Sequence, residues 1–151
     1  MFRGVQQVNM DAKGRLALPT RHRDPLLEEC AGEIVVTIDT QSRCLVIYPL
    51  PGWEEIEKDV QALPSLKPDV KRFQRMILGF ATDIKLDTSG RMVLPQPLRD
   101  YARLDKKLVL VGQGNKVELW SEELWQKECE LALEESGPNA VLSPELMSLA
   151  L

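Results

Sequence analysis

An aspartate and an arginine four residues apart flank a glycine twice in the sequence, as "DAKGR" at residues 11–15 and as "DTSGR" at residues 87–91. An aspartate before a glycine turn can accept hydrogen bonds from backbone N–H groups, and it can also hold a guanidinium. An arginine held in this way suits insertion into a DNA groove, where its fork matches guanine O6 and N7. The same spacing also fits an exposed ion pair that only pins the turn, and such pairs contribute little to stability.

The motif is part of a longer internal repeat. Sliding residues 11–24 by 76 positions onto residues 87–100 matches seven of fourteen residues without a gap. The matched pairs are Asp11/Asp87, Gly14/Gly90, Arg15/Arg91, Leu18/Leu94, Pro19/Pro95, Arg23/Arg99 and Asp24/Asp100. Apolar segments beyond the motif correspond as well, "EIVVTI" with "KLVLVG" and "CLVIYPLPGW" with "KVELWSEELW". The period is far too long for a solenoid repeat, and we interpret it as the duplication of one small β-rich unit.

The pattern of each copy predicts two short strands around a hairpin turn with glycine, a short helix, and two further apolar strands. Between the copies, apolar residues recur at helical spacing on either side of two prolines, which predicts a pair of helices. A third helix is expected after the second copy. We therefore expect a β-rich α+β fold, divided into a first repeat at 5–52, a helical connector at 53–80, a second repeat at 81–124 and a C-terminal helical region at 125–151.

The net charge of −4 hides a strong segregation of charge along the chain. Residues 1–23 carry five basic residues against one acidic residue, and residues 67–75 carry four against one. Residues 118–135, in contrast, carry seven glutamates against one lysine. Such a distribution permits a polyanion-binding face despite the acidic total.

Several function classes lack their signatures in this sequence. His22 is the only histidine and the three cysteines are far apart, which argues against a zinc site. We find no P-loop and no nucleophile elbow, and a carboxylate beside an arginine has a lowered pKa that suits a structural anion better than a proton shuttle. No apolar run approaches the roughly 20 residues that span a bilayer. We therefore expect a cytoplasmic protein that is not an enzyme and has no metal, no cofactor, no membrane partner and no small-molecule substrate.

The opening "MFRG", the element "D-x-K-G-R-x-x-x-P" and its second copy "D-x-x-G-R-x-x-L-P" resemble the MraZ family over essentially the whole chain. This is a family of bacterial transcription regulators of the division and cell wall gene cluster. The resemblance implies two tandem SpoVT-AbrB-like units that form a swapped-hairpin β-barrel within one chain, with flanking helices. It also implies a nucleoid-associated homo-oligomeric ring, a repressor and autoregulator that binds tandem short repeats in double-stranded promoter DNA.

The resemblance implies that Arg15 and Arg91 contact the bases or phosphates of DNA. Lys13 and Arg3 are expected as supporting contacts. The second copy is less basic, because Ser89 stands at the position of Lys13, and Lys85 is expected to offset part of that loss. The remaining motif residues are expected to orient the two arginines: Asp11, Gly14, Asp87 and Gly90.

A second hypothesis is an oligomeric assembly protein whose basic face binds an acidic protein partner, such as residues 118–135 of a neighbouring subunit. Trp53, Trp120 and Trp125 would then mark contacts between subunits or domains, although buried core is the commoner interpretation of a tryptophan. An AbrB-type antitoxin fits less well, because such chains are usually short single copies with a toxin-binding tail. Retention on promoter DNA that falls steeply with salt would favour the regulator.

Overall fold

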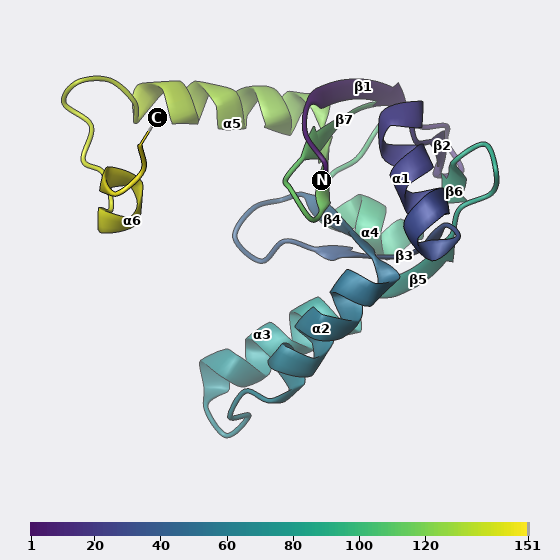
Figure 1. Cartoon of the computed structure of the whole chain (residues 1–151), viewed down its shortest axis with the longest axis horizontal. Helices are drawn as coiled ribbons and strands as arrows, with labels where there is room; N and C mark the ends of the chain where they lie inside the picture. The colour runs from purple at the N-terminus through teal and green to yellow at the C-terminus, as the bar shows by residue number, and fades with distance from the viewer. Residues whose placement is uncertain (151) are drawn as a thin grey trace.

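The apolar segments of both copies form strands, and the turns and prolines divide them. The computed structural model describes residues 1–150. The strands are β1 (Val5–Asn9), β2 (Arg15–Ala17), β3 (Glu33–Ile38), β4 (Leu45–Pro49), β5 (Thr82–Lys85), β6 (Arg91–Val93), β7 (Lys107–Gly112) and β8 (Val117–Ser121). The helices are α1 (Thr20–Cys30), α2 (Leu50–Gln61), α3 (Pro68–Gly79), α4 (Gln96–Tyr101), α5 (Glu122–Glu134) and α6 (Pro144–Met147) (Figure 1).

The strands that flank the two motif turns pair with the other copy. One antiparallel sheet has the order β1-β7-β8-β4-β3-β5, and a two-stranded ribbon joins β2 to β6. Thus β1 of the first copy pairs with β7 of the second copy, and β5 of the second copy pairs with β3 of the first. The ribbon takes one strand from each copy. Each copy therefore supplies strands whose hydrogen-bonding partners lie in the other copy.

The α+β class predicted from the sequence is confirmed, with differences in the sheets. The glycine turns are present, but β1 and β2 are not ladder partners as a simple hairpin would require, because β1 joins the large sheet and β2 joins the ribbon. The physical reason is that both strands find their partners in the second copy. The strands of residues 1–150 form two separate sheets, and no closed barrel is found among them.

Strand β3 lies at the centre of the packing and is buried on both faces, as its continuous apolar sequence "IVVTI" indicates. On one face, leucines from α1, α4 and the residues after the ribbon form the largest apolar cluster, which includes Leu18, Leu26, Leu94 and Leu98. On the other face, Val35 packs in a second cluster with side chains of α2 and α3. The core therefore fixes the ribbon and both motif turns on the sheet.

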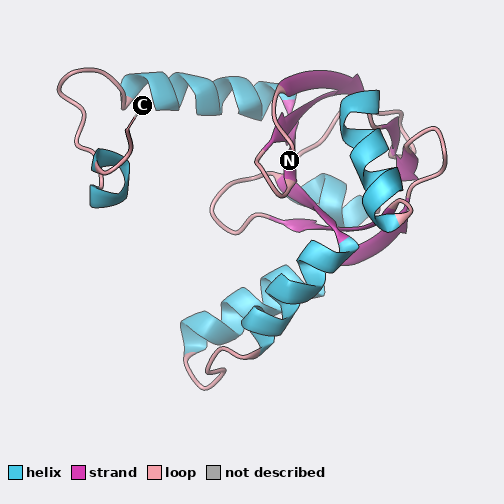
Figure 2. Cartoon of the chain, viewed as in Figure 1, coloured by secondary structure: helices cyan, strands magenta, loops and turns pink. Residues whose placement is uncertain are grey.

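Two helical arms leave this body (Figures 1 and 2). One arm is the hairpin of α2 and α3, whose two helices are separated by the predicted break before Pro68. The other arm is α5, which begins with a capping bond from the N–H of Leu124 to the Ser121 hydroxyl. Among residues 1–150, no helix combines the length and the apolar character needed to cross a bilayer.

Candidate nucleic-acid interface

In the first motif turn, Asp11 holds Arg15 by several bonds. Its Oδ1 accepts the backbone N–H groups of Lys13 and Arg15, each at 2.9 Å. Its Oδ2 accepts the Nε of Arg15 at 2.6 Å. The N–H of Arg15, followed by its guanidinium, lowers the pKa of the Asp11 carboxyl, so the carboxylate stays ionised at neutral pH. The Arg15 side chain is nevertheless 61% exposed, and its terminal nitrogens are free of this clip.

The second motif turn repeats this geometry. Asp87 Oδ1 accepts the N–H groups of Ser89 and Arg91 at 2.9 Å, and Oδ2 accepts the Nε of Arg91 at 2.9 Å. The N–H of Arg91 makes the largest contribution to the lowered pKa of Asp87. The Arg91 side chain is 69% exposed. Both aspartates therefore act as clips that fix the Nε side of an exposed guanidinium.

Each turn is also held by an arginine from the opposite copy. Arg23 on α1 donates from Nη1 to the Ser89 carbonyl at 2.9 Å, and Arg99 on α4 donates to the Ala12 carbonyl at 3.3 Å. Gly14 and Gly90 have φ of +84° and +75°, and each lies so close to the opposite copy that an added Cβ would meet a carbonyl oxygen within 2.9 Å. These close approaches explain why both turns carry glycine.

The ribbon places both motif arginines on one face. In its register Arg15 lies opposite Val93 and Arg91 lies opposite Ala17, while Leu16 and Met92 point to the core. Diagonal neighbours in an antiparallel pair are about 7–8 Å apart. The two guanidiniums therefore share one exposed surface, and both line an open groove of about 560 Å³ beside the ribbon. No signal in the sequence shows that the two repeats meet at this strand pair.

The other predicted cations divide into two groups. Lys85, at the end of β5, lines the same groove as Arg15 and Arg91. Lys13 lies at the tip of the first turn and is exposed. Arg3 precedes β1 at its opposite end, where its backbone packs against Gly112 in the second copy. The structure therefore brings Lys85 to the two arginines and leaves Arg3 away from the motif turns.

Three further residues at the turns were missed by the reasoning from sequence. Arg23 and Arg99 coincide in the repeat, which is a usable signal, but only the structure shows that each clamps the turn of the other copy. The backbone carbonyl of Lys106 accepts a hydrogen bond from the Met10 N–H, and Lys106 lines a cleft beside Asp11. It reaches the first turn through the pairing of β1 with β7, so nothing in the local sequence reveals it.

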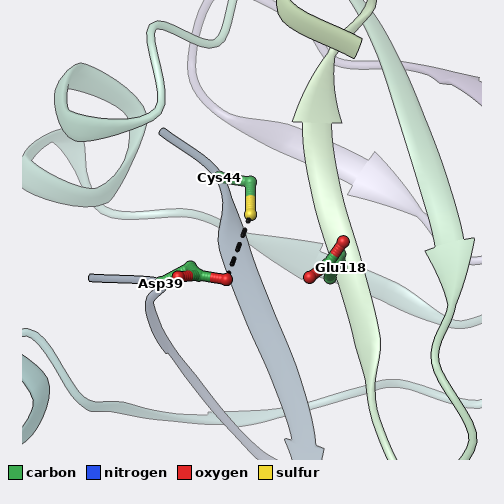
Figure 3. Close-up of side chains that lie close together, drawn as sticks. All are labelled: Asp39, Cys44 and Glu118. Atoms are coloured by element: carbon green, nitrogen blue, oxygen red, sulfur yellow. Dashed lines mark hydrogen bonds between the residues drawn. The ribbon is translucent and has the colours of Figure 1, made fainter. Parts of the chain in front are cut away.

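One mixed cluster of potential metal ligands lies elsewhere, at the connection of β3 and β4 and on β8. The ligand atoms of Asp39, Cys44 and Glu118 lie within 4.8 Å of one another (Figure 3). Burial raises the pKa of the Cys44 thiol, and Glu118 and Asp39 raise it further. Because cysteine binds metals as a thiolate, this setting favours a protonated thiol. The cluster also offers three donors, fewer than the four of a structural zinc site.

Comparison with known proteins agrees with the duplicated architecture. The family model described as "MraZ protein, putative antitoxin-like" matches residues 1–76 and again residues 77–140. A protein of Halorhodospira halophila named transcriptional regulator MraZ is 56% identical over 100% of both chains, and one of Alkalilimnicola ehrlichii with that name is 54% identical over 100% of both. The protein of that name from Pseudomonas aeruginosa is 48% identical, again over the full length of both chains. The chain belongs to the MraZ family.

Proposed function

We propose that the chain is a sequence-specific DNA-binding transcription regulator whose β2–β6 ribbon contacts the major groove. The observation that carries the proposal is the pair of exposed arginines, each clipped by an aspartate, on one face of a two-stranded ribbon. A major groove admits such a ribbon, and an arginine fork pairs with guanine. The names of the relatives support regulation of transcription as the outcome.

In this proposal Arg15 and Arg91 read bases, and Asp11 and Asp87 orient them. The clips occupy Nε, so the terminal nitrogens remain available to guanine O6 and N7. Lys13 and Lys85 contact phosphates and set the register of the ribbon on the duplex. Ser89 replaces a lysine in the second turn, so the two turns make unequal contributions to phosphate binding.

We further propose that the pairing between copies corresponds to the swapped-hairpin arrangement of tandem SpoVT-AbrB-like units, at 5–52 and 81–124, with helical regions at 53–80 and 125–151. Copies of the chain assemble into a ring that presents several ribbons to tandem short promoter repeats, so modest contacts add through effective concentration. The regulator acts in the cytoplasm on the nucleoid, as a repressor of the division and cell wall genes and of its own gene.

A charge-conserving variant tests base reading directly. Arg15→Lys keeps the positive charge but loses the planar fork, so it separates phosphate contact from guanine contact. We expect fluorescence anisotropy to show that the variant loses part of the wild-type preference for the duplex from upstream of its own gene over a scrambled duplex, because Arg91 still reads a base. The matched control, Lys58→Arg on α2, keeps the wild-type preference. If Arg15→Lys retains the full preference for its own promoter, Arg15 does not read a base.

A further inference from the structure

The outer half of α5 is exposed in the part of the chain that the structure describes, residues 1–150. The helix packs on β7 and β8, and near its beginning Leu124 and Trp125 meet Trp120. From Glu130 to Glu134 every residue is exposed, including Leu131 at 46% and Leu133 at 74%. Isolated helices shorter than about 12–15 residues are marginal in water, and helices normally bury their apolar residues. A free helix end that carries exposed leucines is therefore a surface suited to a partner.

The charge of α5 indicates the chemistry of that partner. The helix carries five glutamates and one lysine, and its first turn is acidic. The single lysine, Lys127, forms an ion pair with Glu123 at 3.4 Å. The outer glutamates Glu130 and Glu134, and Glu135 directly after the helix, are exposed and form no ion pair within residues 1–150. The partner of this arm should therefore be basic.

On the other arm, α3 and its N-cap carry the complementary charge, whereas α2 carries four acidic residues and one lysine. Lys71, Arg72 and Arg75 are exposed on α3, and Lys67 lies at its N-cap. These four cations form no ion pair among the residues that the structure describes. Apolar side chains are exposed on this arm as well, with Leu66 98% exposed at the tip and Met76 39% exposed on α3.

This second group of cations is separate from the proposed DNA surface. Figure 1 shows the α2–α3 arm leaving the body on one side and the β2–β6 ribbon lying on the opposite side. The motif arginines are engaged by Asp11 and Asp87, whereas the α3 cations have no such clip. The basic surface of α3 is therefore distinct from the basic surface around the β2–β6 ribbon.

We infer that α5 of one copy docks against α3 of a second copy, head to tail. The inference rests on the oligomer proposed above and names its two surfaces. Both surfaces occur on every copy and differ from each other, so the contact is heterologous: it repeats from copy to copy and closes into a ring when the rotation allows. Charge complementarity selects the pairing, and the exposed leucines of both arms supply apolar contact.

Charge reversal of one surface at a time tests the pairing. One protein carries Lys71→Glu, Arg72→Glu and Arg75→Glu, and the other carries Glu130→Lys, Glu134→Lys and Glu135→Lys. We expect light scattering to show a large assembly for wild type and a mass near the 17.1 kDa monomer for each reversed protein. An equimolar mixture regains the wild-type mass, because each kind of copy then meets a complementary neighbour on both sides. The double change Glu28→Lys and Glu29→Lys on exposed α1 sites leaves the mass unchanged.

A cross-linking experiment on wild type covers the case in which a reversed protein fails to fold. A carbodiimide joins a lysine directly to a carboxylate, and a mixture of light and isotope-labelled chains distinguishes contacts between copies from contacts within one. We expect mixed-isotope links from Lys67 or Lys71 to Glu130 or Glu134. Their absence from the assembled protein, wild-type mass in both reversed proteins, or a folded mixture that stays monomeric would each overturn the pairing.

Failure of this inference is distinguishable from failure of DNA binding. The reversed proteins keep Arg15 and Arg91, so as monomers they still bind a duplex that contains one promoter repeat, and they lose only the gain from multiple repeats. A protein with Arg15→Ala and Arg91→Ala, in contrast, assembles to the wild-type mass and does not bind that duplex. Assembly without the α3–α5 links, together with intact DNA binding, would refute only the docking surfaces.

Discussion

Replacing His22 by leucine should stabilise the protein. His22 is fully buried on α1, and neither of its ring nitrogens has a hydrogen-bond partner. Its ring lies 6.0 Å from that of Phe2, in apolar surroundings. An unsatisfied buried polar group costs about 1–3 kcal/mol. The repeat itself offers the replacement, because Leu98 occupies the corresponding position of the second copy and is 1% exposed. We therefore expect His22→Leu to raise the free energy of unfolding by about 1–3 kcal/mol at pH 7.5.

The difference in the free energy of unfolding between His22→Leu and wild type should grow as the pH falls. Burial lowers the pKa of His22, and the positive charge of Arg21 lowers it further. The unfolded chain, with an ordinary histidine pKa near 6.5, therefore binds a proton more readily than the folded chain below that pH. Wild type therefore loses stability from this residue as the pH falls from 7 to 5. The leucine variant has no such loss, so the difference between the two proteins widens on acidification.

Urea unfolding at pH 7.5 and pH 5.0, followed by circular dichroism at one protein concentration, measures both effects. The matched reverse change, Leu98→His, should destabilise the second copy and add a second acid-sensitive site. The reasoning would be refuted if His22→Leu were less stable than wild type at pH 7.5. It would also be refuted if the difference between the two proteins were the same at both pH values, because His22 would then bind a proton as readily in the folded chain as in the unfolded chain.

Three further changes address the turns and the ribbon. Gly14→Ala places a methyl 2.6 Å from the Leu94 carbonyl oxygen at a φ of +84°, so it should lower the free energy of unfolding by about 1–3 kcal/mol. The control Gly52→Ala has open space around it and should be neutral or stabilising by up to about 1 kcal/mol. Thermal melts compare the two variants. Asp11→Asn should weaken DNA binding several-fold in anisotropy and leave the thermal melt nearly unchanged, because the exposed pair contributes little to folding. Ser89→Lys should strengthen binding and steepen the dependence of log K on log salt by about one unit, and an unchanged slope would exclude a phosphate at that turn.

The fold could be predicted as far as local sequence carries information. Glycine turns, the prolines Pro19 and Pro95 and the helical spacing in the connector indicate the type and order of the elements, and the structure contains strands and helices in that order. The pairing of β1 with β7 and of β5 with β3 could not be predicted, because strand partners that are 46 or more positions apart leave no local pattern in the sequence. The separation of β1 from β2 into different sheets has the same cause.

The sequence indicated which residue types form the candidate site, but it did not indicate how the two copies bring those residues together. The Asp–Arg spacing indicated that each aspartate can hold the arginine, and the structure contains bonds from Arg15 to Asp11 and from Arg91 to Asp87. That both arginines share one ribbon face follows from the register of β2 with β6, which no sequence pattern specifies. Arg3 illustrates the converse, since closeness in sequence to the motif did not bring it to the turns.

The most direct test of the central claim is the affinity of a protein carrying both Arg15→Ala and Arg91→Ala for its own promoter duplex, measured by fluorescence anisotropy at physiological salt. Each lost guanine contact costs about 1–3 kcal/mol, so one chain should lose roughly 30-fold to 10⁴-fold in affinity, and a multivalent ring should lose more. The measurement is valid when the variant keeps its fold and its assembled mass. Affinity within threefold of wild type would contradict the assignment of the ribbon as the DNA-reading surface.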